Sequence, residues 1–175
     1  MAYWIRKASL KAGLQAVLLP HEYHPTVESI DMQILYRKGY RSALVDLDNT
    51  LLPYGKYTLS LRKTAWVQTV ITLGFSVAII SNNKSHERVE LACEQLGVRG
   101  LHFACKPSVG AFFAFNEQTG PYNRPIVIGD QLFTDGIFGN RIGAYTIIVD
   151  PIDPAVSLRK IIQREIERGI MTVLA

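Results

Sequence analysis

Two carboxylates separated by a single residue, Asp46 and Asp48, stand directly after a short apolar run. If that run is a strand, both side chains lean toward the same side of it. Carboxylates held this close repel each other unless a cation or a proton lies between them. Oxygen ligands of this kind suit Mg²⁺, and a third carboxylate, Asp130, follows another apolar run. The pattern therefore predicts a magnesium site.

Further polar residues at the ends of apolar runs complete a set suited to phosphoryl transfer. Lys106 would offset the remaining negative charge and hold an anionic substrate, and Asp135 would orient a bound water or the metal's ligand shell. Ser81 and Asn82, together with nearby backbone N–H groups, are suited to bind phosphate oxygens. A positioned nucleophile, a metal and cationic groups are what phosphoryl transfer needs, so we expect an enzyme that acts on a phosphate ester.

The elements that must position these residues are five short apolar runs separated by segments with helical spacing. The runs predict strands at 43–45, 76–80, 101–104, 125–128 and 144–149, and the segments predict helices at 59–73, 84–96, 108–118 and 134–142. Gly74, Gly97 and Gly120 follow three of the predicted helices, where a helix end favours a left-handed residue. This alternation predicts right-handed βαβ units and a doubly wound, Rossmann-like α/β domain with a parallel sheet. Ligands of such sheets bind beyond the carboxyl ends of the strands, where the polar residues fall.

Four ordered motifs in this sequence resemble those of the haloacid dehalogenase (HAD) superfamily. They are DLDNT at 46–50, SN at 81–82, KP at 106–107 and GDQLFTD at 129–135, and the resemblance covers about residues 42–150. One D-x-D-x-T motif alone would be a weak signal, but four in order on the predicted strand ends are a strong one.

The resemblance implies a role for each motif residue. Asp46 is the implied nucleophile, which forms an aspartyl-phosphate, and Asp48 is the implied general acid and base. Relatives that act as dehalogenases or transport ATPases lack an acid at the position of Asp48, so its presence favours a phosphatase. The resemblance further implies phosphate binding by Thr50 and Ser81, charge stabilisation by Lys106, and Mg²⁺ binding by Asp46, the backbone carbonyl of Asp48, and Asp130.

The spacing between motifs leaves no room for a cap domain, which many HAD relatives insert. About ten residues separate Asp48 from the next predicted helix, and about 24 separate Ser81 from Lys106. This spacing resembles that of the cap-less subfamily III. Within it, the DLDNTL and GDQLFTD motifs, the Leu-Pro pair and the lead-in at 30–35 resemble subfamily IIIA, the bacterial relatives of mitochondrial phosphatidylglycerophosphate phosphatase. That resemblance implies a phospholipid headgroup phosphate, such as phosphatidylglycerophosphate, as the substrate. A soluble sugar phosphate or nucleotide is the alternative substrate.

The 175 residues fit a single domain, and its positive charge lies in the flanks. Residues 1–41 hold six bases and three acids, residues 155–175 hold four bases and two acids, and the middle holds nine bases and ten acids. Basic flanks fit peripheral contact with an anionic membrane. The C-terminal flank also has an apolar stripe typical of an amphipathic helix, but packing on the sheet is the more ordinary role of such a helix. The basic flanks also fit an RNA- or ribosome-associated binding module with a secondary or vestigial phosphatase site, but no aromatic-basic RNA motif is present, so nucleic acid is disfavoured. The oligomeric state stays open.

The remaining features concern location and the less informative residues. No apolar run approaches the roughly 20 residues of a membrane helix, so we expect a cytoplasmic protein, soluble or peripheral at the membrane. The first 20 residues hold three bases and no acid, which leaves organelle targeting open. We expect Cys93 and Cys105 to be buried or half-buried thiols. His21 and His24 have no third metal ligand nearby, so ordinary structural roles are favoured for both.

Overall fold

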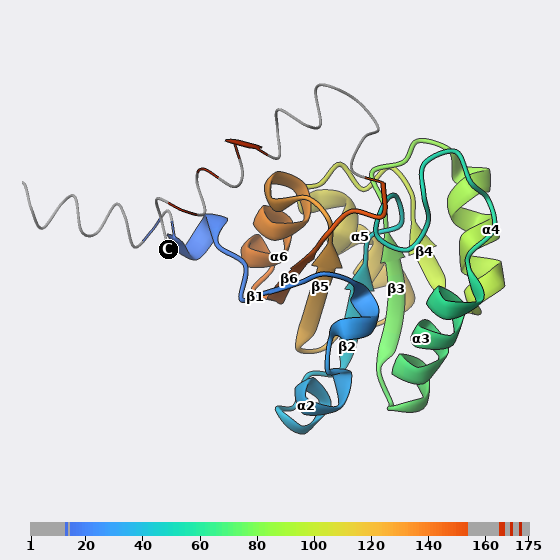
Figure 1. The fold of residues 1–175 in the computed structure, drawn as a ribbon, viewed down its shortest axis with the longest axis horizontal. Coiled ribbons are helices and arrows are strands. Elements are labelled where there is room, and N and C mark those ends of the chain that lie inside the picture. The colour runs from blue at the N-terminus through green and yellow to red at the C-terminus, as the bar shows by residue number, and fades with distance from the viewer. Residues whose placement is uncertain (1–12, 14, 154–164, 167–168, 170–171, 173–175) are drawn as a thin grey trace, which may run out of the picture.

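The fold is known from a computed structural model, which describes residue 13, residues 15–153 and residues 165, 166, 169 and 172. In the part of the chain that is described, six parallel strands form one sheet in the order β1-β6-β5-β2-β3-β4 (Figure 1). The strands are β1 (Glu22–His24), β2 (Ser42–Val45), β3 (Ser76–Ile80), β4 (Arg99–Leu101), β5 (Pro125–Gly129) and β6 (Tyr145–Val149). The predicted α/β fold with a parallel sheet is therefore confirmed.

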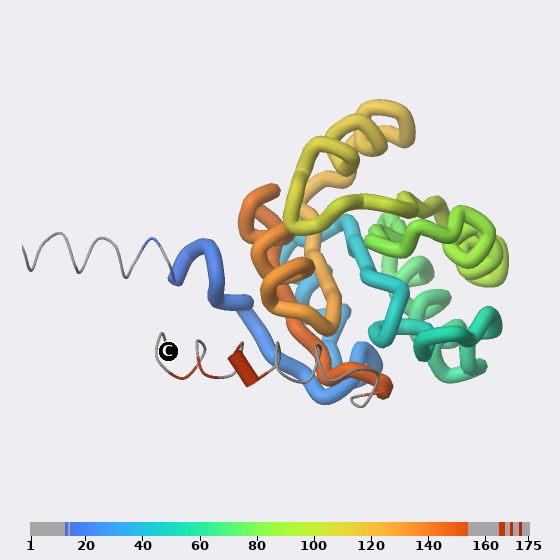
Figure 2. The backbone as a smooth tube through the Cα atoms, turned by 90° about the horizontal axis from the view of Figure 1, so that it is seen from above, coloured from blue at the N-terminus to red at the C-terminus, as the bar shows by residue number. Residues whose placement is uncertain are grey.

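Helices cover both faces of the sheet because side chains alternate between its faces along each strand. Ala43 and Val45 of β2 pack into one core cluster with Trp66, whereas Leu44 packs into another with Phe138. The first cluster is covered by η1 (Val27–Ser29), α2 (Met32–Arg37), α3 (Leu61–Thr72) and α4 (His86–Leu96), and the second by α5 (Gly110–Thr119) and α6 (Ile137–Arg141). Helices α3 and α5 thus lie on opposite sides of the sheet (Figure 2).

The chain reverses its direction across the sheet between β2 and β5. Helices α3 and α4 carry it from β2 through β3 to β4, and α5 then returns it to the other side of β2, where β5 pairs with Val45 opposite Ile128. Right-handed crossovers in opposite directions require helices on opposite faces. The loops after β2 and β5 therefore diverge, and this switch point is where open α/β sheets bind ligands.

The predicted boundaries are confirmed within a few residues, with two corrections. Gly97 and Gly120 have the expected positive φ at helix ends. The strand predicted at 101–104 is wrong in position, since β4 ends at residue 101 and the positive φ of Phe103 and Cys105 does not continue a strand. The helix predicted from residue 134 begins earlier, as the π-helical turn η2 (Leu132–Gly136), and continues as α6.

The N-terminal flank contributes a strand and core residues that the sequence did not predict. Strand β1 pairs with β6, with Tyr23 opposite Ile148, and Val27 and Leu35 belong to the larger core cluster. No helix among the described residues is long and apolar enough to cross a membrane. Residues 1–12 and nearly all of the C-terminal amphipathic segment lie outside the described residues. Cys93 is buried as expected, but Cys105 is exposed because it lies in the loop after β4.

Candidate active site

The polar residues that follow four different strands line one pocket at the carboxyl edge of the sheet. The pocket has a volume of about 360 Å³, and its wall is formed by Asp46, Asp48, Tyr54, Ser81, Asn82, Asn83, Lys106, Gln131 and Thr134. Residues 46–60, all of them described, connect β2 to α3 with one isolated bridge and no inserted domain. Within the part of the chain that the structure describes, the pocket therefore opens without a cap.

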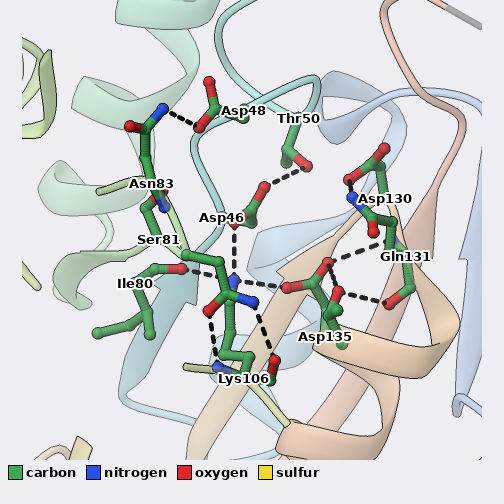
Figure 3. Close-up of polar contacts among 12 residues, drawn as sticks. Asp46, Asp48, Thr50, Ile80, Ser81, Asn83, Lys106, Asp130, Gln131 and Asp135 are labelled. Atoms are coloured by element: carbon green, nitrogen blue, oxygen red, sulfur yellow. Dashed lines mark hydrogen bonds and ion pairs between the residues drawn. The ribbon is translucent and has the colours of Figure 1, made fainter. Parts of the chain in front are cut away.

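Lys106 lies at the base of this site and links two carboxylates. Its buried Nζ donates to Asp46 Oδ1 at 2.7 Å, Asp135 Oδ1 at 2.6 Å and the Ile80 carbonyl at 2.5 Å (Figure 3). These three acceptors match the three protons of an ammonium group. Burial alone would lower the pKa of Lys106, but Asp135 and Asp46 outweigh it and raise the pKa above its usual range. The lysine is thus held charged and in one position.

Asp46, Asp130 and Asp135 form a buried cluster of acids whose nearest oxygens all lie within 4.8 Å of one another. Burial raises the pKa of Asp46, Lys106 opposes that rise, and the two neighbouring carboxylates add to it. Three carboxylates face one ammonium, so the cluster has an excess of negative charge when ionised. Closely spaced carboxylate oxygens with unbalanced charge fit a hard cation such as Mg²⁺. Two of the three predicted metal ligands, Asp46 and Asp130, belong to this cluster.

Asp135 reaches the site because of a π-turn and a glycine. In η2 the Gly136 N–H donates to the Gln131 carbonyl, five residues back, at 3.3 Å, and the Gln131 N–H donates to Asp135 Oδ2 at 3.1 Å. The carboxylate then lies against the backbone of Gly129, where a Cβ would overlap with it. Glycine at position 129 is therefore required for Asp135 to approach Lys106.

Asp48 has two partners that the sequence did not predict. The Asn83 amide donates to Asp48 Oδ2 at 2.7 Å (Figure 3), and Arg88 donates to Oδ1 through Nε at 3.0 Å and Nη2 at 2.9 Å. Arg88 belongs to no motif, but it falls on the buried face of α4 beside Val89 and Ala92. A single arginine on an otherwise apolar helix face was the available signal for it.

Of the predicted phosphate-binding residues, Asn82 uses its side chain to bind the backbone of Lys106. Its side-chain amide donates to the Lys106 carbonyl at 2.9 Å, and its Oδ1 accepts from the Lys106 N–H at 2.6 Å. Asn82 thus holds the main chain of the lysine. Thr50 Oγ1 donates to Asp46 Oδ2 at 3.4 Å, and Ser81 Oγ accepts from the Asn83 N–H at 3.0 Å. Phosphate binding by Thr50, Ser81 and Asn82 stays a prediction.

His21 and His24 each contact a local partner near the β1 edge of the sheet. His21 Nδ1 lies 2.8 Å from Thr146 Oγ1, and His24 Nε2 lies 2.8 Å from a carboxylate oxygen of Glu22. Burial lowers the pKa of His21, and the nearby Glu22 charge opposes this effect. Neither histidine belongs to a cluster of metal-ligating side chains among the described residues.

The cap-less, doubly wound sheet with these side chains at its switch point is the arrangement expected of the HAD class, and the family match identifies the chain as a phosphatase of that class. The chain belongs to the family described as mitochondrial PGP phosphatase, which matches residues 13–153. It is 33% identical over 162 residues to the probable phosphatase YqeG of Bacillus subtilis, covering 92% of this chain and 94% of that protein.

Two further relatives are phosphatidylglycerophosphate phosphatases. The chloroplastic/mitochondrial enzyme of Arabidopsis thaliana is 27% identical over 79% of this chain, and the chloroplastic enzyme of Chlamydomonas reinhardtii is 28% identical over 82% of it. The chain spans only 42% and 57% of the length of these two proteins.

Proposed function

We propose that the protein is a Mg²⁺-dependent phosphatase that hydrolyses a phosphomonoester through an aspartyl-phosphate on Asp46. We further propose that the ester is the headgroup phosphate of a phospholipid such as phosphatidylglycerophosphate. The observation that carries the proposal is the position of Asp46, which lies at the pocket wall, 2.7 Å from Lys106 and within 4.8 Å of two more acids.

In the first step, a carboxylate oxygen of Asp46 forms a bond to the phosphorus of the ester. The bond between phosphorus and the alcohol oxygen breaks, and that oxygen takes a proton from Asp48, which lines the same pocket. Lys106 holds Asp46 in place and partly balances the local negative charge. Bound by Asp46, the backbone carbonyl of Asp48, and Asp130, Mg²⁺ would supply positive charge to the phosphoryl oxygens.

In the second step, Asp48 now acts as the base. It takes a proton from a water molecule whose oxygen forms a bond to phosphorus, and the bond between Asp46 and phosphorus breaks. Asp46 returns to a carboxylate and inorganic phosphate leaves. Asp48 ends the cycle protonated, as it began, so protons and bonds balance over the two steps.

The lipid substrate is supported by the open pocket and by the relatives. No domain inserted between β2 and α3 encloses the pocket, so a phosphate on a large or membrane-bound molecule can reach it. Two relatives are named phosphatidylglycerophosphate phosphatases. Contact of the basic flanks with an anionic membrane would bring the site to such a substrate.

The test is a panel of phosphate esters assayed with Mg²⁺ by release of inorganic phosphate. Phosphatidylglycerophosphate in vesicles is compared with glycerol 3-phosphate, a hexose phosphate and a nucleoside monophosphate at equal ester concentration. We expect the lipid ester to be preferred, and a preference for a soluble ester would rule out the lipid substrate.

The nucleophile is tested in the same assay with Asp46→Asn. We expect this variant to fold and to lose activity, whereas Asp150→Asn, an exposed carboxylate just after β6, keeps it. Activity of Asp46→Asn close to that of the wild type would show that the proposed mechanism is wrong.

A further inference from the structure

Arg88 is buried at the N-terminal turn of α4, with 5% of its surface exposed. A guanidinium group is costly to bury unless its N–H groups find acceptors. Its contacts are hydrogen bonds to Asp48 Oδ1 and to the carbonyls of Pro53 and Lys56, and a cation–π contact 5.3 Å from the ring centre of Tyr57. None of these contacts belongs to the helix that carries Arg88.

The contacts of Arg88 join Asp48 to the 53–57 loop, which we define as residues 53–57 between β2 and α3. Nε and Nη2 both reach Asp48 Oδ1, Nη2 also reaches the Pro53 carbonyl at 2.9 Å, and Nη1 reaches the Lys56 carbonyl. The planar fork of a guanidinium group can satisfy several acceptors in fixed directions, which a lysine cannot. A displacement of either partner is therefore passed to the other through one rigid group.

The 53–57 loop also borders the pocket. Tyr54 lines the pocket together with Asp48, so the loop and the acid face the same bound molecule. The other oxygen of Asp48 accepts from Asn83 at 2.7 Å. Arg88 and Asn83 together leave the Asp48 carboxyl little freedom to rotate.

We propose that Arg88 is a positioning residue that fixes the Asp48 carboxyl for proton transfer to the leaving alcohol, and that it couples this position to the 53–57 loop. The inference rests on the proposed function, because it takes Asp48 as the general acid. It adds a residue outside the four motifs to the machinery of the reaction.

The experiment compares two esters that differ in their need for a proton. The leaving group of p-nitrophenyl phosphate departs without being protonated, whereas the alcohol oxygen of an alkyl phosphate needs a proton to leave. The alkyl ester is the one that the wild type hydrolyses fastest in the panel described above. The measured quantity is kcat/KM, which covers the steps up to release of the alcohol.

For Arg88→Gln we expect kcat/KM to fall about 10- to 100-fold for the alkyl ester and less than about 3-fold for p-nitrophenyl phosphate, since general acid catalysis contributes about 10²–10⁴. The matched control is Arg62→Gln on α3, where the arginine side chain is 77% exposed; both values should stay at the wild-type level. An equal fall for the two esters, or no fall, would overturn the inference, because a purely structural role lowers both alike.

Two further variants keep the test decisive if Arg88→Gln does not fold, which circular dichroism would show. Arg88→Lys keeps the charge but not the fork, and Asn83→Ala removes the hydrogen bond to the other oxygen of Asp48. Each should show a smaller loss that is again selective for the alkyl ester, and an unselective loss in both would refute the inference. Asp46→Asn, measured alongside, separates the two proposals. If it stays active, the proposed function fails; if it is inactive while the Arg88 variants are unselective, only the inference fails.

Discussion

Removal of one acid from the Asp46, Asp130 and Asp135 cluster should abolish Mg²⁺-dependent stabilisation of the fold. One oxygen from each of the three carboxylates lies within 4.8 Å of the corresponding oxygen of the other two. At an effective dielectric constant of 20, two unit charges at that distance repel each other by about 3.5 kcal/mol. When all three acids are ionised, Lys106 balances only one of the three charges, so a bound cation relieves repulsion that the metal-free protein carries in that state.

The size of the effect follows from linkage between binding and folding. A ligand that binds only the native state at 100 times its dissociation constant stabilises it by about 2.7 kcal/mol. For a chain of this length each kcal/mol shifts the melting temperature by about 2–4 °C, so we expect a rise of about 5–11 °C in wild type. In Asp130→Asn the rise should fall below about 2 °C, because one ligand is lost. Without metal, the variant should melt at or above the wild-type temperature, since a repelling charge is gone.

The assay is thermal unfolding in chelator-treated buffer with stepwise addition of MgCl₂. KCl at matched ionic strength controls for screening, and Asp150→Asn controls for loss of an exposed carboxylate. An equal rise in Asp130→Asn and wild type would refute the assignment of Asp130 to the metal. Metal-free Asp130→Asn melting several degrees below metal-free wild type would refute the repulsion argument.

Three other predictions test the packing and the charges around the site. Gly129→Ala should displace Asp135 and lower the rate of phosphate release roughly 100-fold. Thermal melts should show a stability loss of about 1–3 kcal/mol. Unchanged activity would contradict the close approach of Asp135 to the backbone of Gly129. Burial would raise the pKa of Glu28, but the hydrogen bond from Lys63 at 2.9 Å, the positive charge of Lys63 and local hydrogen bonds together outweigh it and lower the pKa below 4.5. Glu28→Gln should therefore cost about 1 kcal/mol at pH 7, and denaturant titrations should show this loss shrinking as the pH falls below 4.5; a loss independent of pH would contradict it. Burial, together with Glu90, raises the pKa of Cys93 to about 11. A thiol reagent at pH 8 should therefore modify Cys105 quickly and Cys93 only after denaturation. Rapid modification of both cysteines would contradict the buried position of Cys93.

The central strands could be predicted from the sequence because both of their faces are buried. Strands β3 and β5 read as unbroken apolar runs, as expected for strands covered by helices on both sides. Once the sheet is parallel, the residues after each run must meet at one edge. For that reason Asp46, Lys106 and Asp130 could be placed together before the structure was known.

Strand β1 could not be predicted for the opposite reason. It has three residues, Glu22, Tyr23 and His24, at the edge of the sheet, and none of them is fully buried. A short polar edge strand has no apolar run, and its pairing with β6 depends on contacts far along the chain. The π-turn that places Asp135 was equally invisible, because a helical pattern does not reveal where one extra residue enters the turn.

Two residues that support the site still depart in the sequence from the apolar pattern of the element that contains them. Arg88 is a charged residue on the buried face of α4, and Gly129 ends a strand of large apolar residues with no side chain. Each weakens the element that contains it, since the first must bury a charge and the second leaves the strand without a side chain to pack. In both cases an acid of the site contacts the unusual residue: Asp48 accepts a hydrogen bond from Arg88, and Asp135 packs against the backbone of Gly129. A residue that is unfavourable in its own helix or strand, and that the core packing does not require, is therefore a place to look for groups that position the active site. This holds even where no cap domain and no further motif indicates such groups.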